Sequence, residues 1–144
     1  MNRRLKPISL ILGLVLSALT LLSWTMTWFV IVVAESGDSR QTMSITGETA
    51  APALAALGLA GLALVAALAI AGRVFRVVLG LLQAAIGVSI GISAWGALVD
   101  PVAASTPLVT QATGISGGES VEALVVATTV TPWPAFTIVI GVLL

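Results

Sequence analysis

APALAALGLAGLALVAALAIAGRVFR, residues 51–76, is the stretch that decides the fold. Residues 51–72 carry no charge, and about 20 apolar residues in a helix cross the hydrocarbon core of a bilayer. Arg73 and Arg76 then interrupt the apolar pattern, which continues over residues 75–98. Because the connection is so short, the sequence predicts two antiparallel membrane helices.

Two further apolar segments flank this pair. Residues 8–27 are uncharged and predict another membrane helix. A cleaved signal peptide is the alternative, which the length of the apolar run, to Ala34, disfavours. Residues 133–144 begin a fourth helix, but they cover only about 18 Å. We expect the chain to continue past Leu144, with a half-spanning segment as the alternative. The predicted fold class is an all-α polytopic membrane protein with a four-helix transmembrane unit.

Charged residues are sorted between the two sides of these helices. Five basic residues lie at the N-terminus or between the second and third helices, and every acidic residue lies within 28–50 or 99–132. The basic residues are Arg3, Arg4, Lys6, Arg73 and Arg76, with Arg40 as the exception, and the acidic residues are Glu35, Asp38, Glu48, Asp100, Glu119 and Glu122. Cytoplasmic flanks of membrane helices retain lysine and arginine. The pattern predicts a plasma-membrane protein with a cytoplasmic N-terminus and both acidic segments outside.

The composition excludes a water-soluble fold and most classes of catalytic and metal site. Only 8% of the residues are charged, against roughly a quarter in a soluble domain, and the mean hydropathy is +1.15. Cysteine, histidine and tyrosine are absent, which removes disulfides, the usual metal and haem ligands and the commonest general base. No basic cluster suggests nucleic acid as a partner. We therefore predict no enzyme activity, no catalytic or metal-binding residue, no cofactor and no nucleic-acid partner.

The first outside segment, 28–50, has the pattern of a β-hairpin. Residues 29–33 are mostly β-branched, 41–46 alternate polar with apolar, and Ser36-Gly37-Asp38-Ser39 between them favours a turn. The alternative is a tilted first helix that reaches residue 33. The predicted apolar face of the hairpin consists of Phe29, Ile31, Val33, Met43 and Ile45. Whether this face packs on the chain itself or on another chain stays open. Beyond the hairpin, Thr49 is predicted to cap the second helix.

The second outside segment, 99–132, begins where Asp100-Pro101 stops the third helix. Its first half is rich in Ser, Thr, Pro and Gly and is predicted to be a long loop. Val121–Val130 predicts a strand beside the hairpin, with a short helix from Ser120 as the alternative. Together the two segments predict a small extracytoplasmic β-rich cap.

The tryptophans Trp24, Trp28, Trp95 and Trp133 map to the outer ends of the predicted helices. Tryptophan concentrates at the headgroup level of a bilayer, so these residues are predicted membrane-interface anchors. Trp24 and Trp28 would share a face if the first helix reached that far. An aromatic platform for a lipid or an apolar small molecule is the alternative.

Small residues recur along the predicted helices and let helix backbones approach closely in lipid. The predicted helix-packing residues are Ser9, Gly13, Ser17, Gly58, Gly61, Gly87 and Gly91. Packing within the chain is one use, and a docking face for another membrane protein is the other. Gln83 is the only strongly polar side chain in the predicted spans, and we expect it to hydrogen-bond a neighbouring helix or to reach the interface. No ionisable residue lies at depth for ion coupling.

Four different short motifs are distributed along the whole chain. They are Trp24-x-x-x-Trp28, Ile45-Thr46-Gly47-Glu48 leading into Ala50-Ala51-Pro52-Ala53-Leu54, then Gly72-Arg73-Val74 and Thr131-Pro132-Trp133-Pro134. With these motifs the chain resembles the tryptophan-operon-associated membrane proteins of actinobacteria, which are encoded near tryptophan biosynthesis genes. The resemblance implies four membrane helices and assigns no catalytic or binding residue. It suggests a link to tryptophan or indole by association only.

The sequence thus predicts a non-catalytic integral membrane accessory or assembly subunit that docks onto a larger membrane complex. The basis is the missing catalytic residue types together with the small-residue helix faces. The alternative is a small oligomeric carrier or binding protein for tryptophan, indole or a similar apolar molecule. Expected partners are the lipid bilayer and either a membrane protein or further copies of this chain.

Overall fold

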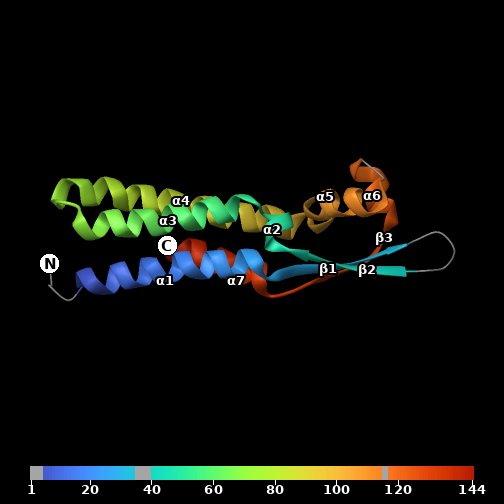
Figure 1. The fold of residues 1–144 in the computed structure, drawn as a ribbon, viewed down its shortest axis with the longest axis horizontal. Coiled ribbons are helices and arrows are strands. Elements are labelled where there is room, and N and C mark those ends of the chain that lie inside the picture. Colours follow the sequence, from blue (N-terminus) through green and yellow to red (C-terminus); the bar gives the residue numbers. More distant parts are fainter. Residues whose placement is uncertain (1–4, 35–39, 115–116) are drawn as a thin grey trace.

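The computed structural model describes residues 5–34, 40–114 and 117–144, which form an elongated molecule with long helices at one end and a small sheet at the other (Figure 1). The elements in chain order are α1 (Leu5–Thr25), β1 (Thr27–Ala34), β2 (Arg40–Thr46), α2 (Gly47–Ala50), α3 (Ala53–Ile70), α4 (Arg73–Val99), α5 (Pro101–Thr113), α6 (Gly118–Leu124), β3 (Val125–Val130) and α7 (Trp133–Leu143). The start of α1 and the connection between α3 and α4 lie at the end remote from the sheet. Arg73 and Arg76 are therefore separated from the sheet by the length of the helices.

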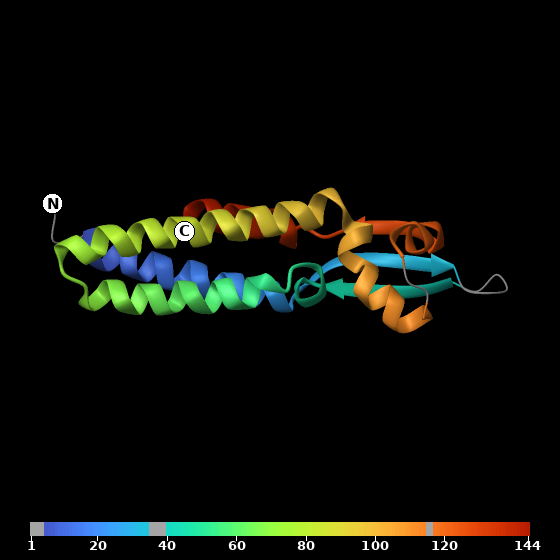
Figure 2. The ribbon, with the colours of Figure 1, turned by 90° about the horizontal axis from the view of Figure 1, so that it is seen from above.

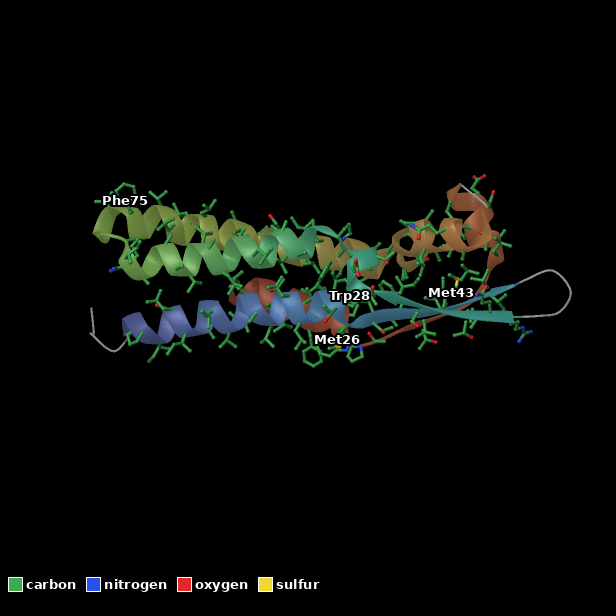
Figure 3. All side chains as sticks on the ribbon, viewed as in Figure 1. Met26, Trp28, Met43 and Phe75 are labelled. Carbon is green, nitrogen blue, oxygen red and sulfur yellow. The ribbon has the colours of Figure 1, made fainter. Side chains whose placement is uncertain are left out.

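Three helices are long and apolar enough to cross a membrane, and they fall in three of the predicted segments: residues 7–25 of α1, 53–70 in α3 and 74–99 of α4. With 21 residues, α1 is about 32 Å long. Apolar side chains project outward along these helices, among them Phe75 at the end remote from the sheet, 70% exposed (Figure 3). Such a surface is stable against lipid tails rather than water.

Helix α7 lies against α4 and also contacts α1 (Figure 2). It has 11 residues and is therefore about 16 Å long, which is too short to cross a bilayer. The four-helix transmembrane unit and the continuation past Leu144 stay predictions.

The first helix ends earlier than predicted. It stops at Thr25, and Met26 turns the chain into β1 with its N–H donated to the Ser23 carbonyl at 3.2 Å. The predicted hairpin is confirmed, because β1 and β2 pair antiparallel with Phe29 opposite Ile45. The tilted-helix alternative to residue 33 is wrong. The predicted turn, Ser36 to Ser39, lies outside the described residues.

A third strand completes the sheet, whose order is β2-β1-β3. Strand β3 pairs antiparallel with β1, placing Val130 opposite Phe29. The predicted strand Val121–Val130 is right in its second half, and the alternative helix is right in the first half, where α6 begins at Gly118.

The loop predicted for the first half of residues 99–132 is wrong, because α5 occupies most of it. The Asp100 carboxylate accepts the backbone N–H of Ala103 at 2.9 Å and caps α5, with Pro101 in the first helical turn. Gly114 then ends α5 with φ of 71°, a left-handed conformation that glycine adopts without strain. The stop signal at the end of α4 is thus also the start signal of α5.

Helices α5 and α6 cover one face of the sheet. Phe29, Ile31 and Ile45 are fully buried in one apolar cluster with Val109 of α5 and Val121 of α6. Figure 3 shows Met43 on the side of the sheet that faces these helices. The apolar face of the hairpin therefore packs on the chain itself rather than on another chain.

The predicted cap at Thr49 is also wrong. Residues Gly47–Ala50 form the short helix α2, in which the Ala51 N–H reaches the Gly47 carbonyl at 2.8 Å. Pro52 stands before α3, with no side-chain capping bond. A backbone turn takes the place of the predicted side-chain cap.

Candidate functional site

The predicted small residues of α1 and α3 are used where these two helices cross. A Cβ atom added to Gly58 would lie 2.8 Å from Leu21, and one added to Gly61 would lie 2.6 Å from the Ser17 hydroxyl oxygen. Gly13 makes a similar approach at the same interface, to a side chain of α3. These glycines hold helices of one chain together, so they are not available as a docking face.

The second glycine contact joins α4 to α7. A Cβ on Gly141 would lie 2.9 Å from the backbone nitrogen of Gly91, and a Cβ on Gly87 would collide with the Gly141 carbonyl. Gly91 itself would accept a Cβ without contact, so Gly87 and Gly141 are the two residues of this contact that tolerate no side chain. The sequence reasoning missed Gly141, although a glycine in the apolar segment 133–144 was the available signal. Ser9, the remaining small residue, is exposed near the start of α1.

Trp28 is not a membrane anchor. It lies in β1, is fully buried, and donates its indole N–H to the Ser23 carbonyl at 2.9 Å. Its ring meets Phe29 edge-on, with centroids 6.4 Å apart. Because α1 ends at Thr25, Trp24 and Trp28 do not share a helical face, and the aromatic platform built on that pair is wrong.

The other tryptophans remain accessible to lipid. Trp95 is 61% exposed on α4, whereas Trp24 and Trp133 are half-buried. Their anchoring role stays a prediction. The indole N–H of Trp24 is enclosed and has no partner among the described residues.

The sheet and the long helices are joined by closely packed backbone, called the junction below. Thr131 donates its backbone N–H to the Trp28 carbonyl at 2.9 Å, and its hydroxyl lies within hydrogen-bond distance of the Thr27 carbonyl, at 2.8 Å, and of the Trp28 carbonyl, at 2.9 Å. The Gly47 N–H donates to the Met26 carbonyl at 3.0 Å. A Cβ on Gly47 would lie 2.8 Å from the Trp28 indole nitrogen, so the backbone packs directly on the ring. With one residue between α1 and β1, the junction contains no flexible linker.

A hydroxyl contact continues this junction into the helices. The Ser23 and Thr137 hydroxyl oxygens lie 2.5 Å apart, which joins α1 to α7. Both residues are fully buried. The sequence offered no signal for this pair, because its members are 114 positions apart.

The outer edge of β3 is the most exposed part of the sheet. β3 lies at the edge, pairs only with β1, and carries no charged residue. Val126 and Val130 are 55% and 45% exposed. β2, at the opposite edge, begins with Arg40 and presents exposed polar side chains such as Thr42. Charged residues protect sheet edges, so β3, which has two exposed threonines but no charge, lacks the protection that Arg40 gives to β2.

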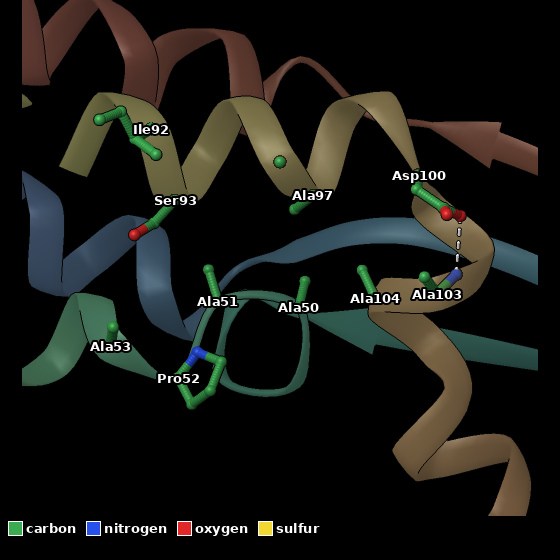
Figure 4. A pocket seen from close by; sticks show the side chains of 11 residues that line it. Ala50, Ala51, Pro52, Ala53, Ile92, Ser93, Ala97, Asp100, Ala103 and Ala104 are labelled. Atoms are coloured by element: carbon green, nitrogen blue, oxygen red, sulfur yellow. Dashed lines mark hydrogen bonds between the residues drawn. The ribbon is translucent and has the colours of Figure 1, made fainter. Parts of the chain in front are cut away.

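A cavity of about 370 Å³ lies where the helices meet the sheet end (Figure 4). Alanines of α2, α3, α4 and α5 make most of its wall. The Asp100 carboxylate lines it but already caps α5. Ser93 also lines it and donates its hydroxyl to the Ser89 carbonyl. The polar groups of this cavity are therefore engaged in helix structure.

The carboxylates that the structure describes outside the long helices form no cluster of three. Glu119 and Glu122 are both exposed on α6, where water can solvate them. In the described ranges no three His, Cys, Asp or Glu side chains gather where they could hold a metal ion.

Three long apolar helices joined to a small sheet define this chain as a membrane protein. The chain belongs to the tryptophan-associated transmembrane protein family, whose family model matches residues 10–144. The family resemblance in the sequence is thereby confirmed. No similar curated protein and no similar solved structure is found.

Proposed function

We propose that this chain is a non-catalytic accessory or assembly subunit that docks onto a larger membrane complex through the outer edge of β3. The observation that carries the proposal is the exposed, uncharged edge strand. Its outward backbone N–H and C=O groups can pair with a strand of a partner, and its valines can bury apolar surface at the same time.

The rigid junction supports this role. The contacts of Gly47 and Thr131 with Trp28 fix the sheet on the helices. A partner bound at β3 would be held at a set distance from the bilayer. This is a property that an assembly subunit needs.

The charge distribution supports an orientation in the plasma membrane with the N-terminus in the cytoplasm and the sheet outside. Arg73 and Arg76 lie at the end remote from the sheet, whereas Asp100 and the acidic helix α6 lie at the sheet end (Figure 1). Basic residues are retained on the cytoplasmic side.

The test is purification of the tagged, full-length protein from its own membrane in mild detergent, followed by mass spectrometry of stoichiometric companions. We expect Val126→Lys to lose the companion, because a buried lysine at a strand interface is strongly unfavourable. Thr42→Lys is the matched control, an exposed position on the polar edge strand β2, and it should keep the companion.

Two results would contradict the proposal. One is a wild-type protein that is purified alone as a monomer. The other is a Val126→Lys protein that retains its companion at the wild-type ratio. Loss of the companion in both lysine variants would also place the contact away from the β3 edge.

A carrier or binding protein for tryptophan, indole or a similar apolar molecule is the second candidate. It is supported by the name of the family and by a second cavity, which lies between the long helices. Unchanged tryptophan and indole uptake and export in a deletion strain would count against it.

A further inference from the structure

We infer that the segment which docks at β3 belongs to another integral membrane protein and leaves the bilayer as a strand directly after a transmembrane helix. This inference rests on the proposed docking at β3, and it names the kind of segment that occupies the edge. Its basis is the direction of the three strands relative to the long helices, together with the position of α6 (Figure 1).

Both edges of the sheet run toward the long helices. β1 follows α1 after one residue and leads away from the helices, and β2 and β3 are each antiparallel to β1. Every strand pair in the described sheet is thus antiparallel, and parallel pairs are slightly less stable. A partner strand that continues this pattern at β3 must lead away from the bilayer.

A second copy of this chain does not offer such a strand. Copies inserted the same way in one membrane present β2 and β3 edges that all run toward the helices, so two edges would meet as parallel strands. Among the described residues, the strand that leads away from the helices is β1, which is already paired on both sides. The occupant of the edge is therefore a different protein.

The inner end of β3 lies where the helices begin. β3 ends at Val130, and only Thr131 and Pro132 separate it from α7. Six residues of strand are about 20 Å long, so a strand that covers β3 begins at the bilayer and ends about 20 Å further out. The chain in front of that strand lies in the bilayer, where a helix satisfies its backbone groups.

The chain itself contains this arrangement once. α1 ends at Thr25, and the uncharged, largely β-branched strand β1 begins at Thr27 and pairs with the inner edge of β3. The proposed segment repeats the same order, a transmembrane helix followed by an outgoing strand, at the outer edge of β3.

The outer edge also leaves one face of the sheet incomplete. Opposite residues of an antiparallel pair share a face, so Val130, opposite Phe29, belongs to the face that α5 and α6 cover. Phe29 is fully buried, whereas Val130 is still 45% exposed. An apolar side chain of the partner strand beside Val130 would extend the buried cluster. The proposed strand is therefore apolar on this face.

Helix α6 adds a charge requirement at the outer end of β3. It ends at Leu124, directly before Val125, and Figure 2 shows it beside β3 rather than beside β2. Glu119 and Glu122 of this helix are exposed. A lysine or arginine at the outer end of the partner strand would complement these carboxylates. The docking segment is thus an apolar strand that starts at the bilayer and ends in a basic residue.

The test is disulfide formation in the native membrane between the full-length chain and the companion that is purified with it. The chain has no cysteine, so Val126→Cys and Val130→Cys each introduce one reporter. Single cysteines are placed along the companion segment that follows its transmembrane helix. We expect Val130→Cys to react just after that helix and Val126→Cys to react about four residues further along the companion. Thr42→Cys on β2 is the control and should react with none of these positions.

The inference alone is overturned, with the proposed function left standing, if Val126→Lys releases the companion but no transmembrane helix precedes the reacting segment. It is equally overturned if the order of the reacting positions is reversed, which is the parallel arrangement, or if the disulfides join two copies of this chain. Absence of a disulfide from both Val126→Cys and Val130→Cys, with the companion still bound, would place the contact away from β3 and overturn the docking as well.

Discussion

Replacing Gly47 by alanine should loosen the attachment of the sheet to the helices. An alanine Cβ at this position would lie 2.8 Å from the Trp28 indole nitrogen and 2.9 Å from the carbonyl oxygens of Ser23 and Trp24. Two of these three atoms belong to the backbone at the end of α1, so they cannot move aside as the tip of a side chain could. The chain must therefore shift where α1, β1 and α2 meet.

The expected cost is about 1–3 kcal/mol, the usual range for overpacking a tight site. Gly96→Ala is the matched control, because a Cβ there meets nothing within 4 Å and the position is inside α4. Neither glycine has a positive φ, so alanine is conformationally acceptable at both positions. At Gly96 the higher helix propensity of alanine should add up to about 1 kcal/mol of stability.

The assay is thermal unfolding of the purified protein in detergent, followed by tryptophan fluorescence. We expect a lower melting temperature for Gly47→Ala and an unchanged or higher one for Gly96→Ala. A Gly47→Ala protein as stable as the wild type would refute the argument that the backbone packs directly on Trp28.

Two further predictions concern Trp28 and the orientation of the chain. Trp28→Phe removes the indole N–H that pairs with the Ser23 carbonyl and should cost about 1–3 kcal/mol, whereas Trp95→Phe, at an exposed position, should change the melting temperature little. Equal shifts in thermal unfolding would contradict the burial of Trp28. The chain has no cysteine, so single cysteines report sidedness directly. A membrane-impermeant maleimide should label Ser120→Cys in intact cells and Gly72→Cys, at the exposed connection between α3 and α4, only after permeabilisation, and the reverse pattern would invert the proposed orientation.

The sequence already contained one signal that the loop prediction overlooked. Asp100-Pro101 indicates the end of one helix and, equally, the cap and first turn of the next. Gly114 supplies the matching stop. The Ser, Thr and Pro content between them, including Pro107 inside α5, is typical of a loop and hides these helix-end signals.

The sequence by itself determined the apolar spans, the separation of charge and the hairpin. Each of these depends on residues close together in the chain: the hydropathy of 51–72, the position of Arg73 and Arg76, and the alternation around Ile45. Transfer into lipid and strand pairing across a short turn are decided by such local patterns.

Only the tertiary structure decided which of the predicted tryptophan anchors, packing glycines and polar side chains face lipid and which face the protein. Gly47 of α2 packs on the ring of the buried Trp28, and Gly141 has no room for a side chain because α7 lies on α4. Gln83 is buried between helices that are distant in the chain, and within the described residues neither of its amide atoms has a hydrogen-bond partner. These contacts join segments far apart in the chain, and their existence depends on how the helices cross, which a single sequence does not encode in any local pattern.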